Sequence, residues 1–160
     1  MKILIIYDSY FGNTAKVAQT IKETMAGKSD VEVLKIDEYD KSRLQGVDLL
    51  IAGSPTRAFS PTKKISSAIK SIRKTEAEGM SFAAFDTRIS MDDINVKFIR
   101  YMQNKRGGAA DILAKYLAKK SINMIVPPAG FIVAESEGPL KDGEDQKIKD
   151  WAKQIIERSF

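Results

Sequence analysis

The sequence predicts a doubly wound α/β fold, in which five parallel strands in the order 2-1-3-4-5 form one sheet with helices on both faces. Two observations predict it. Apolar runs of strand length alternate along the chain with longer segments whose apolar residues recur every three or four positions. The first run, Lys2–Asp8, also leads through a turn rich in hydroxyls and glycine directly into a helical pattern. With 160 residues, 43% of them hydrophobic, the chain is expected to form a single domain over residues 1–160.

The strands are expected where apolar and β-branched residues run together between turn residues. In chain order these runs are Lys2–Asp8, Val31–Lys35, Asp48–Gly53, Ser81–Phe85 and Ile122–Val126, the last resuming from Phe131 to Ala134. Pro127 and Pro128 interrupt the last run. Because proline cannot donate to a strand ladder, this run is expected at an edge or a bulge.

The helices are expected where apolar residues repeat at helical spacing. In chain order these segments are Thr14–Met25, Pro61–Lys74, Gly108–Lys120 and Gly143–Arg158. In the last of them Trp151 lies at helical spacing from Ile148 and Ile155. Its ring is therefore expected in the core rather than against a ligand.

The residue types that the chain lacks exclude several kinds of chemistry. It contains no cysteine, which excludes disulfides, thiolate metal sites and a cysteine nucleophile. It contains no histidine, the commonest general base and metal ligand. No apolar stretch approaches the length of a membrane span and no signal peptide is visible. The protein is therefore expected to be cytoplasmic, with no membrane partner.

The formal net charge of +5 is the unusual feature of the composition. A positive field speeds the encounter with acidic partners and slows the encounter with basic ones. A solvated surface without a partner is the alternative interpretation of the same charge. Nucleic-acid binding is not expected, because the lysines and arginines are dispersed and no basic motif interleaved with aromatic residues occurs.

The turn after the first strand has the composition of an anion-binding site. Its residues are Ser9, Tyr10, Phe11, Gly12, Asn13 and Thr14. The backbone N–H groups at the start of the following helix point toward this turn. Hydroxyls and an amide add donors, and Gly12 permits a close approach of the backbone. An ordinary N-capped turn is the alternative, but the place of the turn at the start of an α/β chain favours a phosphate site.

The segment Ile5–Ala18 resembles the phosphate loop of the flavodoxin family: two aliphatic residues and an aromatic one, then serine, Gly-x-Thr and alanine. The resemblance implies a flavodoxin-like fold and a loop that holds the phosphate of FMN with hydroxyls and backbone amides alone. Other phosphate loops fit worse, because the chain has no G-x-x-x-x-G-K motif and no G-x-G-x-x-G after a strand.

The loop after the third strand is similar to the second flavin loop of flavodoxin-like proteins, including their quinone-reductase relatives. The candidate FMN contacts in it are Ser54, Pro55, Thr56, Arg57, Ala58 and Phe59. Thr56 has a hydroxyl to donate to the phosphate or the ribityl chain, and Phe59 offers a flat apolar face. Alternatively, Ser54 and Thr56 cap the turn and Phe59 packs on the following helix.

Asp86, Thr87 and Arg88 follow the fourth strand, at the position of the family's third loop along the flavin ring. The resemblance implies that backbone amides, Thr87 and Arg88 bond the polar edge of the ring. A cation there stabilises the anionic reduced flavin and raises its potential. Alternatively, Arg88 pairs with Asp86 or Asp8 at the surface.

Residues Ser90–Gly107 look like an insertion that the resemblance does not cover. Ile94, Phe98, Tyr101 and Met102 lie at helical spacing between charged residues, which predicts a short amphipathic helix. Three interpretations follow: a lid over the flavin, a docking face for a redox partner or a second subunit, or a helix packed on the body with a solvated basic side.

The resemblance implies an electron carrier that binds FMN and shuttles low-potential electrons between partner redox proteins. Acidic partners are favoured by the net charge, and a monomer or weak homodimer is expected. The alternative is an FMN-dependent NAD(P)H or quinone oxidoreductase, which the Gly-Ser-Pro-Thr-Arg loop and the positive charge favour, although no nicotinamide-binding motif is visible. A phosphoacceptor signalling domain is excluded, because Asp8 stands alone after the first strand and Gly53-Ser54 end the third.

Overall fold

A computed structural model describes residues 1–93 and 95–159. Within them, six strands form one sheet in which β2, β1, β3 and β4 are neighbours in that order, and β5 and β6 both pair with β4. Every pairing is parallel. The strands are β1 (Lys2–Tyr7), β2 (Asp30–Lys35), β3 (Leu49–Pro55), β4 (Ser81–Ile89), β5 (Asn123–Met124) and β6 (Ala129–Val133). The predicted order 2-1-3-4-5 is confirmed, with two short strands sharing the fifth position.

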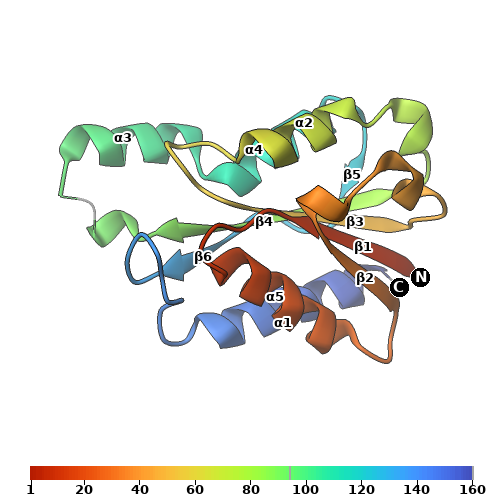
Figure 1. The fold of residues 1–160 in the computed structure, drawn as a ribbon, viewed down its shortest axis with the longest axis horizontal. Coiled ribbons are helices and arrows are strands. Elements are labelled where there is room, and N and C mark those ends of the chain that lie inside the picture. The colour runs from red at the N-terminus through yellow and green to blue at the C-terminus, as the bar shows by residue number, and fades with distance from the viewer. Residues whose placement is uncertain (94, 160) are drawn as a thin grey trace.

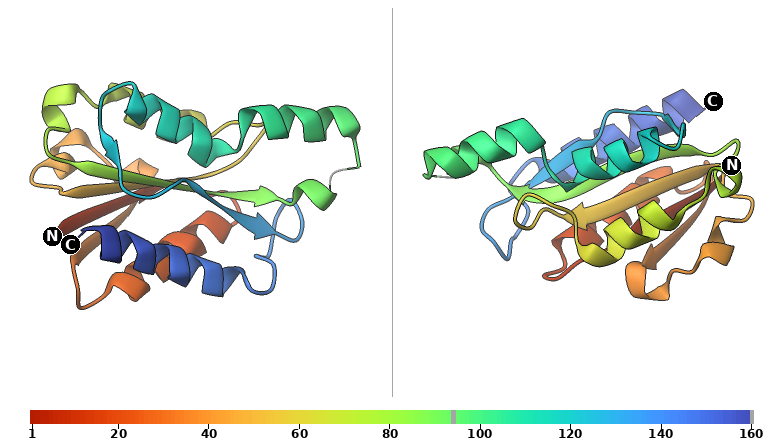
Figure 2. Two further views of the ribbon diagram at one scale, coloured as in Figure 1. Left: turned by 180° about the vertical axis from the view of Figure 1, so that it is seen from behind. Right: turned by 90° about the horizontal axis from the view of Figure 1, so that it is seen from above.

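Helices cover both faces of the sheet, with α1 and α5 on one face and α2 and α4 on the other (Figures 1 and 2). The helices are α1 (Asn13–Met25), α2 (Lys63–Ser71), α3 (Lys97–Arg106), α4 (Ala109–Ala118) and α5 (Glu144–Ser159), and short 3₁₀ turns occur at Ile36–Glu38, Lys41–Leu44, Lys74–Glu76 and Met91–Asp93. Among the residues that the structure describes, no helix has the length and apolar character needed to cross a membrane.

The sheet separates two apolar cores. In β1, Leu4 and Ile6 face the core beneath α2 and α4, while Ile3 and Ile5 face the core beneath α1 and α5. All four are fully buried, because a parallel strand between two helical layers has no solvent face. Trp151 belongs to the second core, as its helical spacing predicts, and its ring meets that of Phe85 edge-on at 6.2 Å.

Two strands differ from the predicted bounds. β4 continues past Phe85 to Ile89, because its last part pairs with β6 and its buried carboxylate at Asp86 has an ion-pair partner. Asp86, Thr87 and Arg88 therefore lie in a strand, and the expectation that they form a loop is wrong. The last strand is split around the two prolines, since proline cannot take part as a donor in the ladder.

α3 projects beyond the carboxyl edge of the sheet, on the side of α2 and α4 (Figures 1 and 2). Its described side chains are exposed except for that of Met102, which is half-buried. The interpretation of this segment as a helix packed on the body is therefore wrong. Residue 94, one of the apolar residues on which the helical spacing was based, lies outside the described residues.

Candidate functional site

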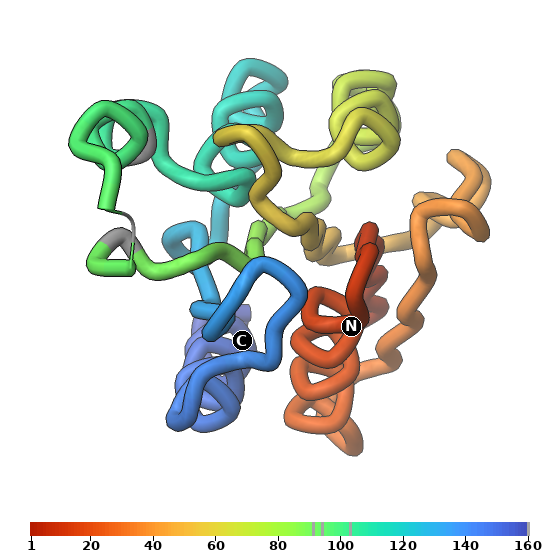
Figure 3. Tube along the Cα trace, turned by 60° about the vertical axis from the view of Figure 1, so that its left-hand side comes forward, coloured from red at the N-terminus to blue at the C-terminus, as the bar shows by residue number. Residues whose placement is uncertain are grey.

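A cavity of about 270 Å³ opens at the carboxyl edge of the sheet, where the segments that follow β1, β3 and β6 meet the end of β4. Figure 3 looks toward this edge, with the loop after β3 (golden), the end of β4 (green) and the loop after β6 (blue) arranged around it. The cavity is lined by Ser9, Tyr10, Phe11, Asn13, Thr14, Pro55, Thr56, Arg57, Ala58, Thr87, Arg88, Ile89, Val133 and Ser136. In parallel α/β sheets this edge, between strands that leave in opposite directions, is where ligands bind.

The turn after β1 presents donors to the cavity. Gly12 is the N-cap of α1 and has a φ of +89°, a conformation that favours glycine. Its N–H donates to Ser9 Oγ at 3.1 Å, so the Ser9 hydroxyl acts here as an acceptor and keeps its own proton to donate. The N–H groups of the first turn of α1 have no partner within the helix and add to this set of donors.

A buried hydrogen bond joins the start of α1 to the end of β4. Thr14 Oγ1 and Thr87 Oγ1 are 2.8 Å apart, and both residues line the cavity. Two hydroxyls that share one hydrogen bond use one proton between them, so one proton remains to be donated to a ligand. This pair therefore connects two parts of the site that lie far apart in the sequence.

The loop after β6 is tied to the same turn. Asn13 Nδ2 donates to the carbonyl of Glu137 at 2.9 Å. Gly138 packs against the Asn13 side chain so closely that a Cβ there would lie 2.4 Å from its Oδ1. These contacts hold the loop beside α1 and bring Ser136 to the cavity.

The loop after β3 forms a two-residue hairpin. Arg57 and Ser60 exchange backbone hydrogen bonds of 2.9 Å in both directions across the pair Ala58–Phe59. Both central residues have positive φ, 45° and 64°, although neither is glycine. This turn places the Arg57 guanidinium over the rings of Tyr10 and Phe11, at 5.0 and 5.8 Å from their centroids. A cation in contact with two aromatic rings therefore lies at the exposed mouth of the cavity.

A buried ion pair lies behind the cavity. Asp86 is fully buried and accepts two hydrogen bonds of 2.6 Å from Arg88, with a third of 2.8 Å from the N–H of Ala110. Burial raises the pKa of the Asp86 carboxyl, and the hydrogen bonds from Arg88 oppose that rise. Burial also disfavours the charged form of Arg88, but its hydrogen bonds to Asp86 outweigh that effect and raise its pKa. The two parallel hydrogen bonds of 2.6 Å have the geometry of a charge-assisted pair.

Two close approaches show how tightly this pair is packed. A Cβ at Gly108 would lie 2.4 Å from the Arg88 Cζ, and one at Gly130 would lie 2.4 Å from its Nε. The guanidinium therefore lies between the start of α4 and β6. The space for it exists because both neighbouring positions are glycine and have no Cβ.

Most of the candidate residues from the sequence come together at the cavity, but four do not line it. Asp86 was expected at the flavin and instead pairs with Arg88 inside the protein. Ser54 is buried and accepts the N–H of Thr62 at 3.0 Å, which is the turn-capping role proposed as its alternative. Gly12 contributes to the turn through its backbone conformation as the N-cap of α1. Phe59 lies in the hairpin after β3, where its φ is positive.

Three lining residues, Ile89, Val133 and Ser136, were not among the candidates. A signal existed for Val133, because it lies near the end of an expected strand and the carboxyl ends of parallel strands share one edge. Ile89 lies at the end of β4. The polar residues before it prevented this part of the strand from being predicted from the sequence. Ser136 reaches the cavity only through the tertiary contact of Asn13 with the loop, and no sequence signal marks it.

Comparisons with known proteins agree on the kind of protein to which this chain is similar. Residues 5–87 match the family model described as flavodoxin. A flavodoxin from Clostridium saccharobutylicum is 33% identical over 93 residues, which are 57% of this chain and 58% of that protein. The chain therefore aligns with little more than half the length of this relative.

Solved structures share the fold over nearly the full chain. Oxidised flavodoxin 1 from Bacillus cereus is 21% identical, with 98% of each chain covered and a TM-score of 0.75. Rubredoxin oxygen:oxidoreductase from Desulfovibrio gigas is 18% identical with a TM-score of 0.77; the match covers 99% of this chain but 36% of that one. At these identities the likeness shows the fold alone.

Proposed function

Because this chain belongs to the flavodoxin family, whose members are electron carriers that bind FMN, we propose that it holds FMN in the cavity at the carboxyl edge of the sheet and carries electrons between partner redox proteins. The observation that supports this most directly is the geometry of the turn after β1. There a glycine with positive φ and a helix N-terminus lie beside the hydroxyls of Ser9, Thr14 and Thr87, which line one cavity.

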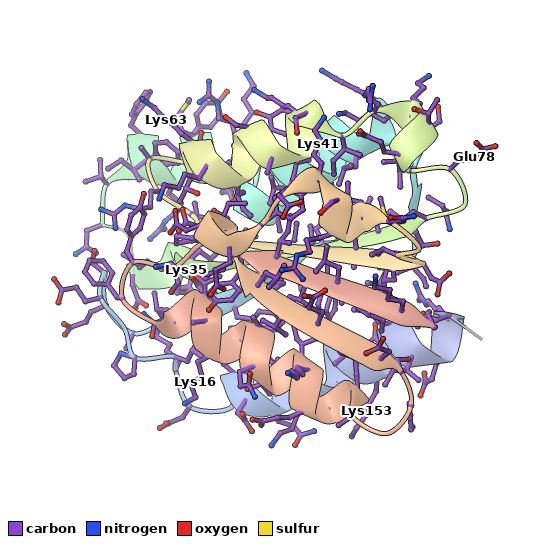
Figure 4. The ribbon with its side chains drawn as sticks, turned by 45° about the vertical axis from the view of Figure 1, so that its right-hand side comes forward. Lys16, Lys35, Lys41, Lys63, Glu78 and Lys153 are labelled. Carbon is purple, nitrogen blue, oxygen red and sulfur yellow. The ribbon has the colours of Figure 1, made fainter. Side chains whose placement is uncertain are left out.

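These donors suit a phosphate without the help of a cation. The Ser9 hydroxyl has its proton to donate, and the Thr14–Thr87 pair has one more. The side chain of Lys16, in the first turn of α1, points outward into solvent (Figure 4). Within this turn the donors are therefore neutral hydroxyls and backbone N–H groups, and their hydrogen bonds to a charged acceptor are the stronger kind.

The remaining lining suits a flat ring with one polar edge. Ile89 and Val133 give the cavity apolar walls, while Tyr10 and Arg57 stand at its mouth. When bound there, FMN supplies the electron-transfer chemistry of the protein. The chain's own part is to hold, orient and shield it.

Arg88 is expected to affect the flavin potential less than an unpaired cation would. Its guanidinium lines the cavity, but two of its N–H groups already serve the carboxylate of Asp86. Asp111 also lies 3.5 Å from the same guanidinium, so two carboxylates compensate its charge and weaken its field at the ring. The proposal is therefore that Arg88 orients the ring edge through its other N–H donors.

The double variant Ser9→Ala/Thr14→Ala tests the phosphate site. The loss of the Ser9 hydroxyl alone, a donor to a charged acceptor, costs roughly 1.5 kcal/mol or more, so FMN should bind at least about tenfold more weakly. Fluorescence titration with FMN measures the affinity. Riboflavin, which lacks the phosphate, should bind the variant and the wild type equally.

Ser67→Ala/Thr75→Ala is the matched control, because it removes two exposed hydroxyls on and after α2. This control should bind FMN as the wild type does. An FMN affinity unchanged in the Ser9→Ala/Thr14→Ala variant would refute the assignment of the phosphate site. An equal loss for FMN and riboflavin would do the same.

A further inference from the structure

The exposed helix α3 stands beside the proposed flavin site without belonging to it. None of the described residues of α3 lines the site cavity, so a lid over the flavin does not match the structure. We propose that α3 is a docking surface for an acidic redox protein that exchanges electrons with the flavin. The electron exchange in this inference rests on the proposed function. The docking rests on the observations of α3 itself.

The apolar side chains of α3 and of the residue before it are exposed to an extent unusual for a folded chain. Phe98 is 69% exposed and Tyr101 58%, and Val96 and Ile99 are exposed as well. Figure 2 shows the helix extending past the body in both views. Large apolar side chains gathered on one projecting element, rather than scattered singly, are typical of an interaction surface.

The charge of α3 has one sign. Its four charged residues are Lys97, Arg100, Lys105 and Arg106, and no carboxylate occurs between Asn95 and Ala110. Asp93, the last carboxylate before the helix, is bound to Lys141 at 2.6 Å. A partner that matches this surface must therefore supply carboxylates around an apolar centre.

Both ends of the segment are anchored to the body. Before the helix, the Asp93–Lys141 ion pair attaches it to the loop that follows β6. After the helix, the N–H of Gly108 donates to Asp111 at 2.8 Å and that of Ala109 to Thr56 Oγ1 at 2.8 Å. These anchors present α3 at a fixed place, and a preorganised surface loses less entropy when a partner binds.

The second anchor is also next to the site. Thr56 and Arg88 line the cavity, and the same two residues contact the start of α4, directly after α3. A protein docked on α3 would therefore lie beside the mouth of the flavin site.

Two other occupants fit α3 less well. A membrane surface requires cations segregated from the apolar face, whereas Lys105 Nζ lies 6.0 Å from the Tyr101 ring, on the same side of the helix. A second copy that docked through its own α3 would bring four cations against four cations, and like charges at a contact oppose association.

The test compares two charge-reversal variants with the same change in net charge. Lys97→Glu/Lys105→Glu alters α3, and Lys22→Glu/Lys153→Glu alters exposed lysines of α1 and α5 on the other face of the sheet, where Lys153 points outward (Figure 4). The probe is a plant-type ferredoxin, a strongly acidic iron–sulfur protein, titrated by calorimetry at low salt. Cytochrome c, a strongly basic haem protein, is the counter-probe.

The α3 variant should bind ferredoxin about tenfold more weakly than the wild type, and the control should lose far less. Phe98→Ala/Tyr101→Ala, which keeps every charge, should also weaken binding. Reduced ferredoxin, which gives one electron to the oxidised flavin, should reduce the FMN-loaded α3 variant correspondingly more slowly. Circular dichroism verifies that the helix persists in each variant.

Equal losses in the α3 variant and the control would overturn the proposal, as would tighter binding of cytochrome c than of ferredoxin by the wild type. Binding to phosphatidylserine vesicles without binding to ferredoxin, or self-association abolished by the α3 variant, would overturn it in favour of another occupant. Calorimetry on the protein without FMN separates the two proposals, because docking on α3 needs no flavin. Failure to bind FMN would refute the proposed function alone.

Discussion

Tyr39 carries a hydroxyl whose oxygen is buried without a hydrogen-bond partner among the described residues. Burial raises its pKa to about 12 from 10.0, and the charges of Glu76 and Asp40 add to the rise. The unfolded chain therefore loses this proton first. The stability that the protonated phenol contributes is complete below pH 10 and is lost as the pH rises toward 12.

The variant Tyr39→Phe should lack this alkaline loss. At pH 7 it should be as stable as the wild type or more stable, because the buried hydroxyl had no partner to lose. Urea unfolding between pH 7 and 12 measures both effects. Tyr101→Phe, which removes an exposed hydroxyl, is the control and should keep the wild-type pH profile. A Tyr39→Phe profile parallel to that of the wild type would contradict the prediction.

At the scale of residues, local signals identified the turn after β1 but not what packs behind it. Ser9, Gly12 and Thr14 could be chosen from sequence because hydroxyls, glycine and a helix start are adjacent there. Asp86 was assigned to the flavin from its position in the family's third loop, but its carboxylate is fully buried. Arg88, two residues further along the chain, donates hydrogen bonds to this carboxylate inside the protein.

The hairpin at Arg57–Ser60 is the strained element of the site. Ala58 and Phe59 both have positive φ, which costs an L-residue roughly 1–2 kcal/mol. Ala58→Gly removes this strain but makes the unfolded chain more flexible, so the net gain in the free energy of unfolding should be about 0.5–1 kcal/mol. Urea unfolding measures it.

Ala26→Gly is the matched control, since Ala26 is exposed and has an ordinary φ of −55°. Here glycine relieves no strain, and stability should fall by about 0.5–1 kcal/mol. The same loss in both variants would show that the hairpin is unstrained.

At the scale of elements, long segments with a periodic apolar pattern could be predicted from the sequence. The ends of elements that depend on tertiary contacts could not. α1, α4 and α5 begin and end within a few residues of their expected bounds, because their apolar faces repeat over several turns. β4 was expected to stop four residues early, since its last part is stabilised by pairing with β6 rather than by its own apolar content. The exposure of α3 was likewise not predictable, because an amphipathic pattern ordinarily indicates burial.

For the whole molecule, the size of the site bears on the choice between a carrier and a reductase. The cavity of about 270 Å³ lies just under the lower end of the usual range for small-molecule sites. No nicotinamide-binding motif occurs in the sequence to supply a second ligand site beside it. Anaerobic addition of NADPH or NADH to the FMN-loaded protein should therefore leave the yellow flavin band unchanged.

Dithionite is the control in this measurement and should bleach the band. Rapid bleaching by NADPH or NADH would instead mean that hydride is transferred directly, and would favour the reductase. The net charge of +5 does not distinguish the two functions, because both an acidic protein and an anionic dinucleotide are attracted to it.

The edge of the sheet beyond β4 determines whether other copies of the protein can add strands to it. The outer side of β6 is covered by the chain itself: the N–H of Lys141 donates to the carbonyl of Ile132 at 2.8 Å, and Leu140 forms a bridge with Val133. An open strand edge is a template on which other copies add and form fibres. Because this edge is occupied from within, strand addition is blocked on the β6 side of the sheet.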